Sequence, residues 1–328
     1  MSFIFRRLVF YLVAAWVALT INFFIPRLMP GNAVQSVMAK FPNLQPSAYK
    51  ALEALLGVGH PGSIWHQYVT YLDDIFHFNF GTDVSQYPAQ VSSLLVQTLP
   101  WTITLVGVAT VIAFLIGTAL GIVAGWRHGG TLDRVLPGLM FLQAIPYFFF
   151  ALILVELLAI KTQVFPSGQG YADGLIPGWH WDFISSALYH SALPALTIVL
   201  TSIAGWMLQM RNVMITTTGE DYVIAAQAKG LPNRRVIYTY AARNALLPQL
   251  QGFGLAVGFV VSGAIVMEIV FGYPGIGLLL LNAVTSNDYP LMQAIFLVIT
   301  FAVLLANLVV DMIIVVADPR ARRREATS

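Results

Sequence analysis

Long stretches without a charged residue constrain this chain more than any other feature. One of them, Val84–Trp126, runs for 43 residues without Asp, Glu, Lys or Arg. Charged residues make up only 10% of the 328-residue chain, whereas a soluble domain carries about 25%. A folded surface this poor in charge cannot be hydrated, so we expect the chain to lie in a bilayer. The 58% of hydrophobic residues also exclude intrinsic disorder, which needs low hydrophobicity.

Six stretches reach the roughly 20 mostly apolar residues that a membrane-spanning helix needs. We expect spans at Leu8–Pro26, Thr98–Trp126, Val135–Val155, within Phe183–Met210, at Asn244–Met267 and at Tyr289–Val310. The predicted fold class is therefore all-α, a polytopic membrane protein with six transmembrane helices. The first stretch follows Arg6 and Arg7 as a secretory signal would, but its length and the lack of an A-x-A cleavage site favour an uncleaved anchor.

The basic residues predict the orientation, because Lys and Arg are retained in short cytoplasmic segments. With the N-terminus inside, 13 of the 17 basic residues fall in inner segments, and only Arg27, Lys40, Lys50 and Lys161 fall outside. Both termini are therefore expected in the cytoplasm.

The spans divide the chain into four predicted parts. Residues 1–29 hold the N-terminal segment and the first span, and residues 30–97 form an external loop with short helices. Residues 98–316 form a five-helix core that includes an inner loop at 211–245. Residues 317–328 are a cytoplasmic tail.

Several kinds of chemistry are missing from the sequence. No lysine follows a glycine, so there is no Walker A loop to bind ATP phosphates. Cysteine is absent, which removes thiolate metal sites and thiol nucleophiles, and the six histidines lack metal-ligand spacing. Basic residues lie beside the spans rather than in a soluble module, so nucleic acid is not an expected partner. We predict no catalytic residue, no metal and no cofactor in this chain.

The longest inner segment, between the fourth and fifth spans, carries signals for the start of a short helix. Thr217 with Glu220, and Thr218 with Asp221, fit the spacing of a capping box. That arrangement places acidic groups at a helix N-terminus, where the helix dipole favours them. We expect the helix to continue through Ala228.

The same segment predicts a sharp turn and a second helix. Lys229 suits a last helical turn, and Gly230 is placed to adopt the left-handed conformation that ends many helices. Pro232 suits the first turn of a second helix, which leads into the fifth span. Val236, Tyr240 and Leu247 approximate one apolar stripe of that helix.

Two interpretations of this helix–turn–helix segment follow from spacing alone. It could be a connector whose charges are merely solvated. Alternatively, the small side chains of Ala225 and Ala226 could let a groove of another protein approach closely, and the tight turn would then transmit force into the fifth span.

The segment from Asp221 to Pro248 resembles the EAA loop of bacterial ABC-importer permeases. Other segments resemble the B-type subunit of the dipeptide/oligopeptide permease family, in the same order and at similar spacing. They are Phe5–Leu8, Pro26–Gly31, Phe80–Thr82, Pro100, Gly117 with Gly121, Asp133–Arg134, Ile145–Pro146, Glu268–Gly277, Asn287–Pro290, Asn307–Asp311 and Asp318–Arg320. Together they cover nearly the whole chain.

This resemblance implies the type I ABC-importer permease fold, with the short inner helix as the coupling helix that docks on an ATP-binding subunit. The residues that would dock are Glu220, Asp221, Tyr222, Ala225, Ala226, Ala228, Lys229, Gly230 and Leu231. The chain departs from the family pattern at Ile224, where the naming glutamate is expected, and at Gln227, which is often basic.

The resemblance also implies the partners and the location. They are a homologous permease in a heterodimer, two ATP-binding subunits that hold ATP and Mg, an external solute-binding protein and membrane lipid, all at the bacterial inner membrane. Di- or oligopeptides are the expected substrate, with oligosaccharides or nickel complexes as alternatives for the same machinery.

Acidic groups and a turn near the spans suggest a gating or structural role. Ionisable groups within spans are costly and often functional, which applies to Glu268 and Asp311. The turn contributes Pro274, Gly275 and Gly277. Local pairing explains the acidic residues equally well, and for Glu156 it is preferred. A self-sufficient secondary transporter or channel is the alternative of another class. It would need an inverted repeat or a chain of such groups, and neither stands out.

Overall fold

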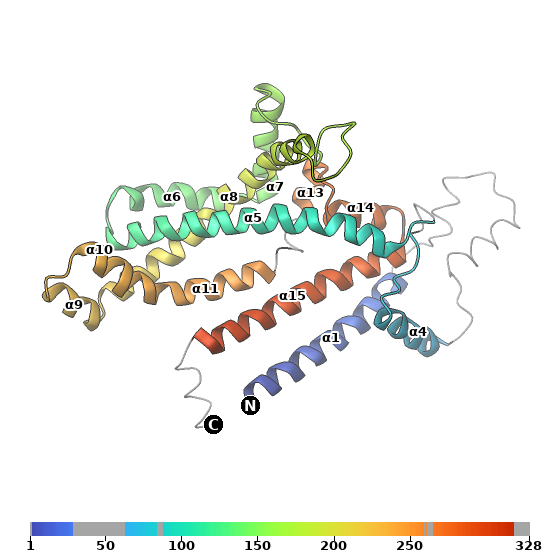
Figure 1. Cartoon of the computed structure of the whole chain (residues 1–328), viewed down its shortest axis with the longest axis horizontal. Coiled ribbons are helices and arrows are strands. Elements are labelled where there is room, and N and C mark those ends of the chain that lie inside the picture. The colour runs from blue at the N-terminus through green and yellow to red at the C-terminus, as the bar shows by residue number, and fades with distance from the viewer. Residues whose placement is uncertain (1, 29–62, 84–87, 259, 261–264, 318–328) are drawn as a thin grey trace, which may run out of the picture. The chain divides into compact units, whose positions relative to one another are not determined.

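A computed structural model describes residues 2–28, 63–83, 88–258, 260 and 265–317. Within these residues the regular elements are helices, apart from one isolated bridge between Thr82 and Gln90. They are α1 (Ser2–Leu28), α4 (Ile64–Phe76), α5 (Val91–Trp126), α6 (Thr131–Ala144), α7 (Tyr147–Leu154), η1 (Val155–Lys161), α8 (Trp181–Thr218), α9 (Asp221–Ala228), α10 (Asn233–Arg235), η2 (Val236–Ala242), α11 (Arg243–Gly258), α13 (Ile265–Phe271), α14 (Ile276–Thr285) and α15 (Tyr289–Ala317) (Figure 1). The segments η1 and η2 are π-helical. The predicted all-α class is confirmed.

Four helices in the described part are long and apolar enough to cross a membrane. They are α1, α5, α8 and α15. Two bent helix pairs, α6 with α7 and η1, and α13 with α14, bring the total to six if each pair is one span. Six is the number expected, but the fifth expected span, Asn244–Met267, falls on α11 and on residues that the structure does not describe, whereas the pair of α13 and α14 lies mostly beyond it.

The third span is broken, in contrast to the continuous helix expected from the sequence. A continuous helix was expected over Val135–Val155, but α6 ends at Ala144 and the chain bends by 97° before continuing through α7 to Lys161. Pro146 explains the break, because proline lacks an N–H donor and disfavours helical geometry in the residue before it. Ile145 accordingly has an extended backbone, with ψ at 127°.

The region of the fifth span also differs from the expected pattern. Helix α11 ends at Gly258, and most of the stretch between it and α13 lies outside the described residues. A turn follows α13, as its glycines and proline predict, and the next residues, Ile276–Thr285, form the apolar helix α14, which was not expected.

Two compact units make up the chain. Residues 1–102 and 274–304 form one unit, and residues 103–273 and 305–328 form the other. The four-part division expected from the sequence stays a prediction.

Glycines bring α5 and α8 into close contact in the second unit. A Cβ atom at Gly117 would lie 2.5 Å from Cβ of Trp206, and one at Gly121 would lie 2.6 Å from the Met207 carbonyl oxygen. Gly125, one turn further on, is equally close to Met214. Small residues at four-residue spacing allow helix backbones in membranes to approach this way. The α5 glycines therefore hold α8, the helix that leads into the predicted inner loop, close against α5.

Candidate functional site

The predicted coupling segment forms a compact group of elements at one end of the second unit. Helix α8 ends at Thr218, and α9 follows after a two-residue break. The chain then turns into α10, η2 and α11, which lie beside α9 and the end of α8 (Figure 1). The expected helix, turn and second helix are all present.

The predicted capping boxes are wrong. Thr217 Oγ1 donates to the Val213 carbonyl at 2.7 Å, and Thr218 Oγ1 donates to the Ile215 carbonyl at 2.8 Å. Because α8 continues through both threonines, their hydroxyls bond back within that helix instead of capping the next one. Glu220 holds the N-cap position of α9 without a side-chain capping bond, and Asp221 lies in the first turn, where the dipole favours it.

The predicted turn at Gly230 is confirmed. Gly230 has φ of +72°, and its N–H donates to the Gln227 carbonyl at 2.9 Å. The Leu231 N–H donates to the Ala226 carbonyl at 3.3 Å. These two bonds with a left-handed glycine form a Schellman motif. A Cβ at Gly230 would meet nothing within 4 Å, so the glycine is required by backbone conformation rather than by space.

One face of α9 packs on a hydrophobic cluster shared with α8, η2 and α11. Val223 and Ala226 supply that face, and both are buried. The cluster that receives them includes Met210, Met214, Val236, Ala241, Ala242 and Ala245, with Leu231 packed against it. Burial on three elements holds α9 in a fixed orientation.

The opposite face of α9 is exposed and holds most of the predicted docking residues. Glu220, Asp221, Tyr222, Ala225, Ala228, Lys229 and Gly230 are exposed, whereas Ala226 faces the cluster and Leu231 is half-buried. Ile224 was not predicted to take part, yet it is exposed beside Ala225. Asp221, Ile224, Ala225 and Ala228 follow the spacing of one helix face, a periodicity that could have identified Ile224 from the sequence.

A π-helical turn changes the register of the helix after Gly230. Val236, Ala241, Ala245 and Gln249 are buried at steps of five, four and four positions, and Ala242 is buried beside Ala241. The five-residue step falls within η2, since a π-turn carries one extra residue. Leu247, predicted on the buried stripe, is therefore exposed instead.

Gln249 connects this segment to two long helices. Its buried Nε2 donates to Thr118 Oγ1 of α5 at 3.2 Å and to the Trp206 carbonyl of α8 at 3.0 Å. Hydrogen bonds of a buried amide are costly to break. Helix α11 is thereby joined to both α5 and α8.

The residues predicted for gating lie in α13, in the turn after it, in the first turn of α14 and in α15. Glu268 is buried, and Gly272 has φ of +55°. The Tyr273 N–H donates to the Glu268 carbonyl at 2.8 Å, and its hydroxyl lies 2.9 Å from Ser191 Oγ. Gly275 and Gly277 are buried, whereas Pro274 and Asp311 are half-buried. A gating role for these five residues stays a prediction.

Local pairing is confirmed for Glu156. Its Oε1 lies 3.5 Å from Lys161 Nζ, and both side chains are exposed. Across the residues that the structure describes, no three His, Asp or Glu side chains are grouped to hold a metal ion.

Comparison with known proteins identifies the family of this chain. The family model of the binding-protein-dependent transport system inner membrane component matches residues 117–323. The dipeptide transport system permease protein DppB of Escherichia coli K12 is 30% identical over 99% of this chain and 100% of its own length. The oligopeptide transport system permease proteins OppB of Haemophilus influenzae and AppB of Bacillus subtilis are 31% and 29% identical, over 98% and 92% of this chain and 99% and 92% of their own lengths. The chain therefore belongs to the family of inner membrane components of binding-protein-dependent transport systems, as a multi-pass permease that is not itself catalytic and works with ATPase and binding-protein partners.

Proposed function

We propose that this permease admits di- or oligopeptides along a path that it forms with a second, homologous permease. One of the two ATP-binding subunits of the transporter would dock on the segment around α9 from the cytoplasm, the side on which we also place both termini. An external binding protein would deliver the substrate to the opposite side, with residues 30–97 as its main contact. The similarity to a dipeptide and an oligopeptide transport system permease supports the peptide assignment.

The exposed face of α9 is the observation that carries the docking proposal. Ala225 and Ala228 present little more than methyl groups there, so a cleft of a partner can reach the helix backbone. Acidic residues stand at the start of α9 and Lys229 at its end, and these charges favour one orientation of the partner.

A rigid connection from α9 to the long helices supports the coupling role. Val223 and Ala226 pack against the methionines of α8, and the same cluster continues into α11. Interiors packed this closely transmit displacement instead of absorbing it. When the ATP-binding subunits close, α9 would therefore carry α8 and α11 with it and alternate access to the path.

The docking surface is tested by Ala225→Arg and Ala228→Arg. Each adds a long side chain to the exposed face and leaves the buried face of α9 unchanged. We expect loss of co-purification with the ATP-binding subunits and loss of ATP-dependent uptake. His128→Arg, an exposed position between α5 and α6, is the control and should keep both. Normal association of Ala225→Arg and Ala228→Arg with the ATP-binding subunits would refute docking at α9.

The substrate is tested by uptake into proteoliposomes that hold the whole transporter, its binding protein and internal ATP. Labelled di- and oligopeptides should accumulate, and unlabelled peptides should compete with them. Accumulation of oligosaccharides or nickel complexes in place of peptides would contradict the peptide assignment and leave the permease role intact.

A further inference from the structure

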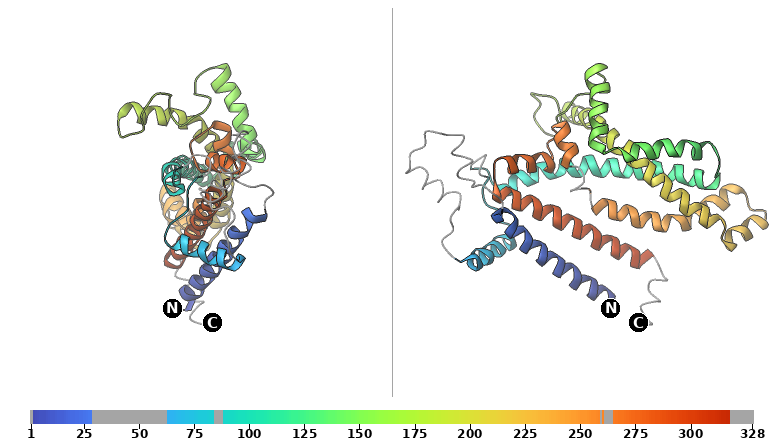
Figure 2. Two further views of the ribbon diagram at one scale, coloured as in Figure 1. Left: turned by 90° about the vertical axis from the view of Figure 1, so that its right-hand side faces the viewer. Right: turned by 180° about the vertical axis from the view of Figure 1, so that it is seen from behind.

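Helix α4 lies against the last turns of the membrane span α1, within the first unit (Figure 2). Tyr68 and Tyr71 of α4 provide the contact. The Tyr68 hydroxyl lies 2.7 Å from Thr20 Oγ1, and the Tyr71 hydroxyl accepts from Asn22 Nδ2 at 3.1 Å. Both tyrosine rings also pack against Phe23, Tyr68 edge-on and Tyr71 tilted, with centroids 5.2 and 5.4 Å away. Burial raises the pKa of Tyr71 to about 12, as expected of a phenol removed from water.

This contact fixes the depth of α4 relative to the membrane. We take the end of the apolar stretch of α1, at Ile25, as the edge of the hydrocarbon core, so Thr20 lies about 7.5 Å inside it at 1.5 Å per residue. Helices that lie in the membrane surface bury their apolar face by about 5–10 Å. Contact with Thr20 therefore holds α4 at the depth of the boundary between headgroups and acyl chains.

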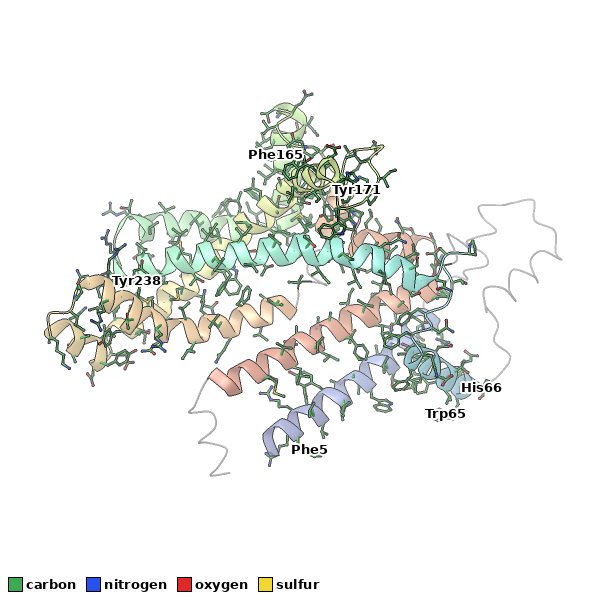
Figure 3. The ribbon with its side chains drawn as sticks, viewed as in Figure 1. Phe5, Trp65, His66, Phe165, Tyr171 and Tyr238 are labelled. Carbon is green, nitrogen blue, oxygen red and sulfur yellow. The ribbon has the colours of Figure 1, made fainter. Side chains whose placement is uncertain are left out.

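A second apolar face of α4 does not pack on α1. Trp65, Val69, Leu72 and Phe76 follow each other at steps of four, three and four residues, the spacing of one helix stripe. Trp65, Val69 and Phe76 are 70%, 47% and 77% exposed, and Figure 3 labels Trp65 at the start of the helix. Water-exposed aromatic stripes are costly, whereas Trp is favoured at membrane surfaces.

The remaining face of α4 is polar. His66, Thr70 and Asp73 are exposed, and Asp73 lies 3.6 Å from the His77 ring. Beside them a cavity of about 280 Å³ is lined by polar groups that include Arg27, Gln67 and Asp74. The helix thus has a packing face, an apolar stripe and a hydrated face, the pattern of a helix that lies in the membrane surface.

We propose that α4 is such an interfacial helix, with the stripe of Trp65, Val69, Leu72 and Phe76 set among the lipid chains of one leaflet. Lipid is the occupant that fits, because the stripe lies at the depth of a surface where α1 itself exposes Ile21, Phe24 and Ile25. The helix anchors the end of α1 at the bilayer surface. The inference needs only that α1 spans the membrane, so it stands apart from the peptide assignment.

Spin labels test this proposal directly, because the chain has no cysteine. Val69→Cys and Phe76→Cys place a label on the stripe, and His66→Cys and Asp73→Cys place one on the polar face. Each variant is labelled in the assembled transporter, with cysteine-free partner chains, in lipid nanodiscs. Ile21→Cys on α1 provides the lipid-exposed reference.

Collision rates with oxygen, which concentrates in lipid, and with a water-soluble nickel chelate give the outcome. We expect the stripe labels to favour oxygen, as at Ile21, and the polar-face labels to favour the nickel chelate. Stripe labels that favour the nickel chelate would place α4 in water and overturn the proposal. Stripe labels shielded from both probes would show that protein covers the stripe, and that result would also overturn it. Trp65→Cys repeats the stripe measurement if another variant fails to assemble.

Discussion

The Arg211 guanidinium and the Asp133 carboxylate form a two-bond ion pair that joins α8 to α6. Arg211 Nε donates to Oδ1 at 2.5 Å and Nη2 donates to Oδ2 at 3.0 Å. The Gly129 N–H donates to the same Oδ2 at 2.7 Å. Three donors on one carboxylate, two of them from a planar guanidinium, give strong and directional bonds. Arg211 neighbours Met210, which packs in the cluster beneath α9, so this pair connects the coupling segment to the bent helix pair of α6.

Removal of this pair should uncouple transport. In Asp133→Asn the charge and one acceptor oxygen are lost, so α6 and α8 keep their apolar packing but lose the ion pair that fixes their relative position. We expect ATP hydrolysis by the assembled transporter to persist while uptake per ATP falls severalfold. Both rates are measured on the same proteoliposomes.

A charge exchange separates positioning from general damage. Asp133→Arg combined with Arg211→Asp restores the attraction but not the acceptor for Gly129, so uptake per ATP should recover in part. Asp173→Asn, at an exposed position, is the control and should leave the ratio unchanged. An unchanged ratio in Asp133→Asn would contradict the role of this pair.

Substitution of Gly230 should weaken the turn after α9. Gly230→Ala places a Cβ on a residue with φ of +72°, which costs about 1–2 kcal/mol. Gly230→Pro should do more harm, since proline cannot adopt this φ and loses the N–H bonded to Gln227. We expect intact membrane insertion and reduced uptake, with proline the worse variant. Gly138→Ala is a matched control in α6, where a Cβ meets nothing within 4 Å, and normal uptake in Gly230→Pro would refute the role of the turn.

Close packing at Gly121 gives a prediction about stability. In Gly121→Ala the added Cβ would lie 2.6 Å from both the Met207 carbonyl oxygen and Met210 Cβ, so the backbones must separate. Overpacking of this kind costs about 1–3 kcal/mol and should lower the unfolding temperature of the purified protein. Gly107→Ala lies on the same helix with nothing within 4 Å and should not lower it. Equal unfolding temperatures for the two variants would contradict close contact of α5 and α8.

Features set by local chemistry could be predicted from the sequence. The apolar stretches locate the four long helices α1, α5, α8 and α15, because the bilayer demands length and hydrophobicity alone. The turn after α9 could be predicted from Gly230, since few other residues adopt a left-handed conformation without strain. The family resemblance identifies α9 as the candidate docking helix, because the motif that carries the resemblance is contiguous in the chain.

Features set by tertiary packing could not be predicted in this way. Ala225 and Ala226 are chemically identical, and only the cluster around Met210 and Val236 decides that Ala226 is buried. Thr217 and Thr218 fit a capping box, but they form the last residues of α8, and their hydroxyls bond to carbonyls of that helix. Pro146 permits a kink or a break, and the sequence does not distinguish the two.

The last prediction follows from the π-turn in η2 and concerns the register of the helix that continues into α11. In a regular α-helix starting at Val236, Leu247 would approach the buried face and Ala245 would not. The extra residue of the π-turn exchanges these positions, so Ala245 is buried and Leu247 is exposed. Ala245→Leu should therefore overpack the cluster and cost about 1–3 kcal/mol, whereas Leu247→Ala should change stability by about 0.5 kcal/mol or less. Unfolding temperatures of the two purified variants provide the comparison, and a larger loss for Leu247→Ala would indicate the regular register and exclude the π-turn.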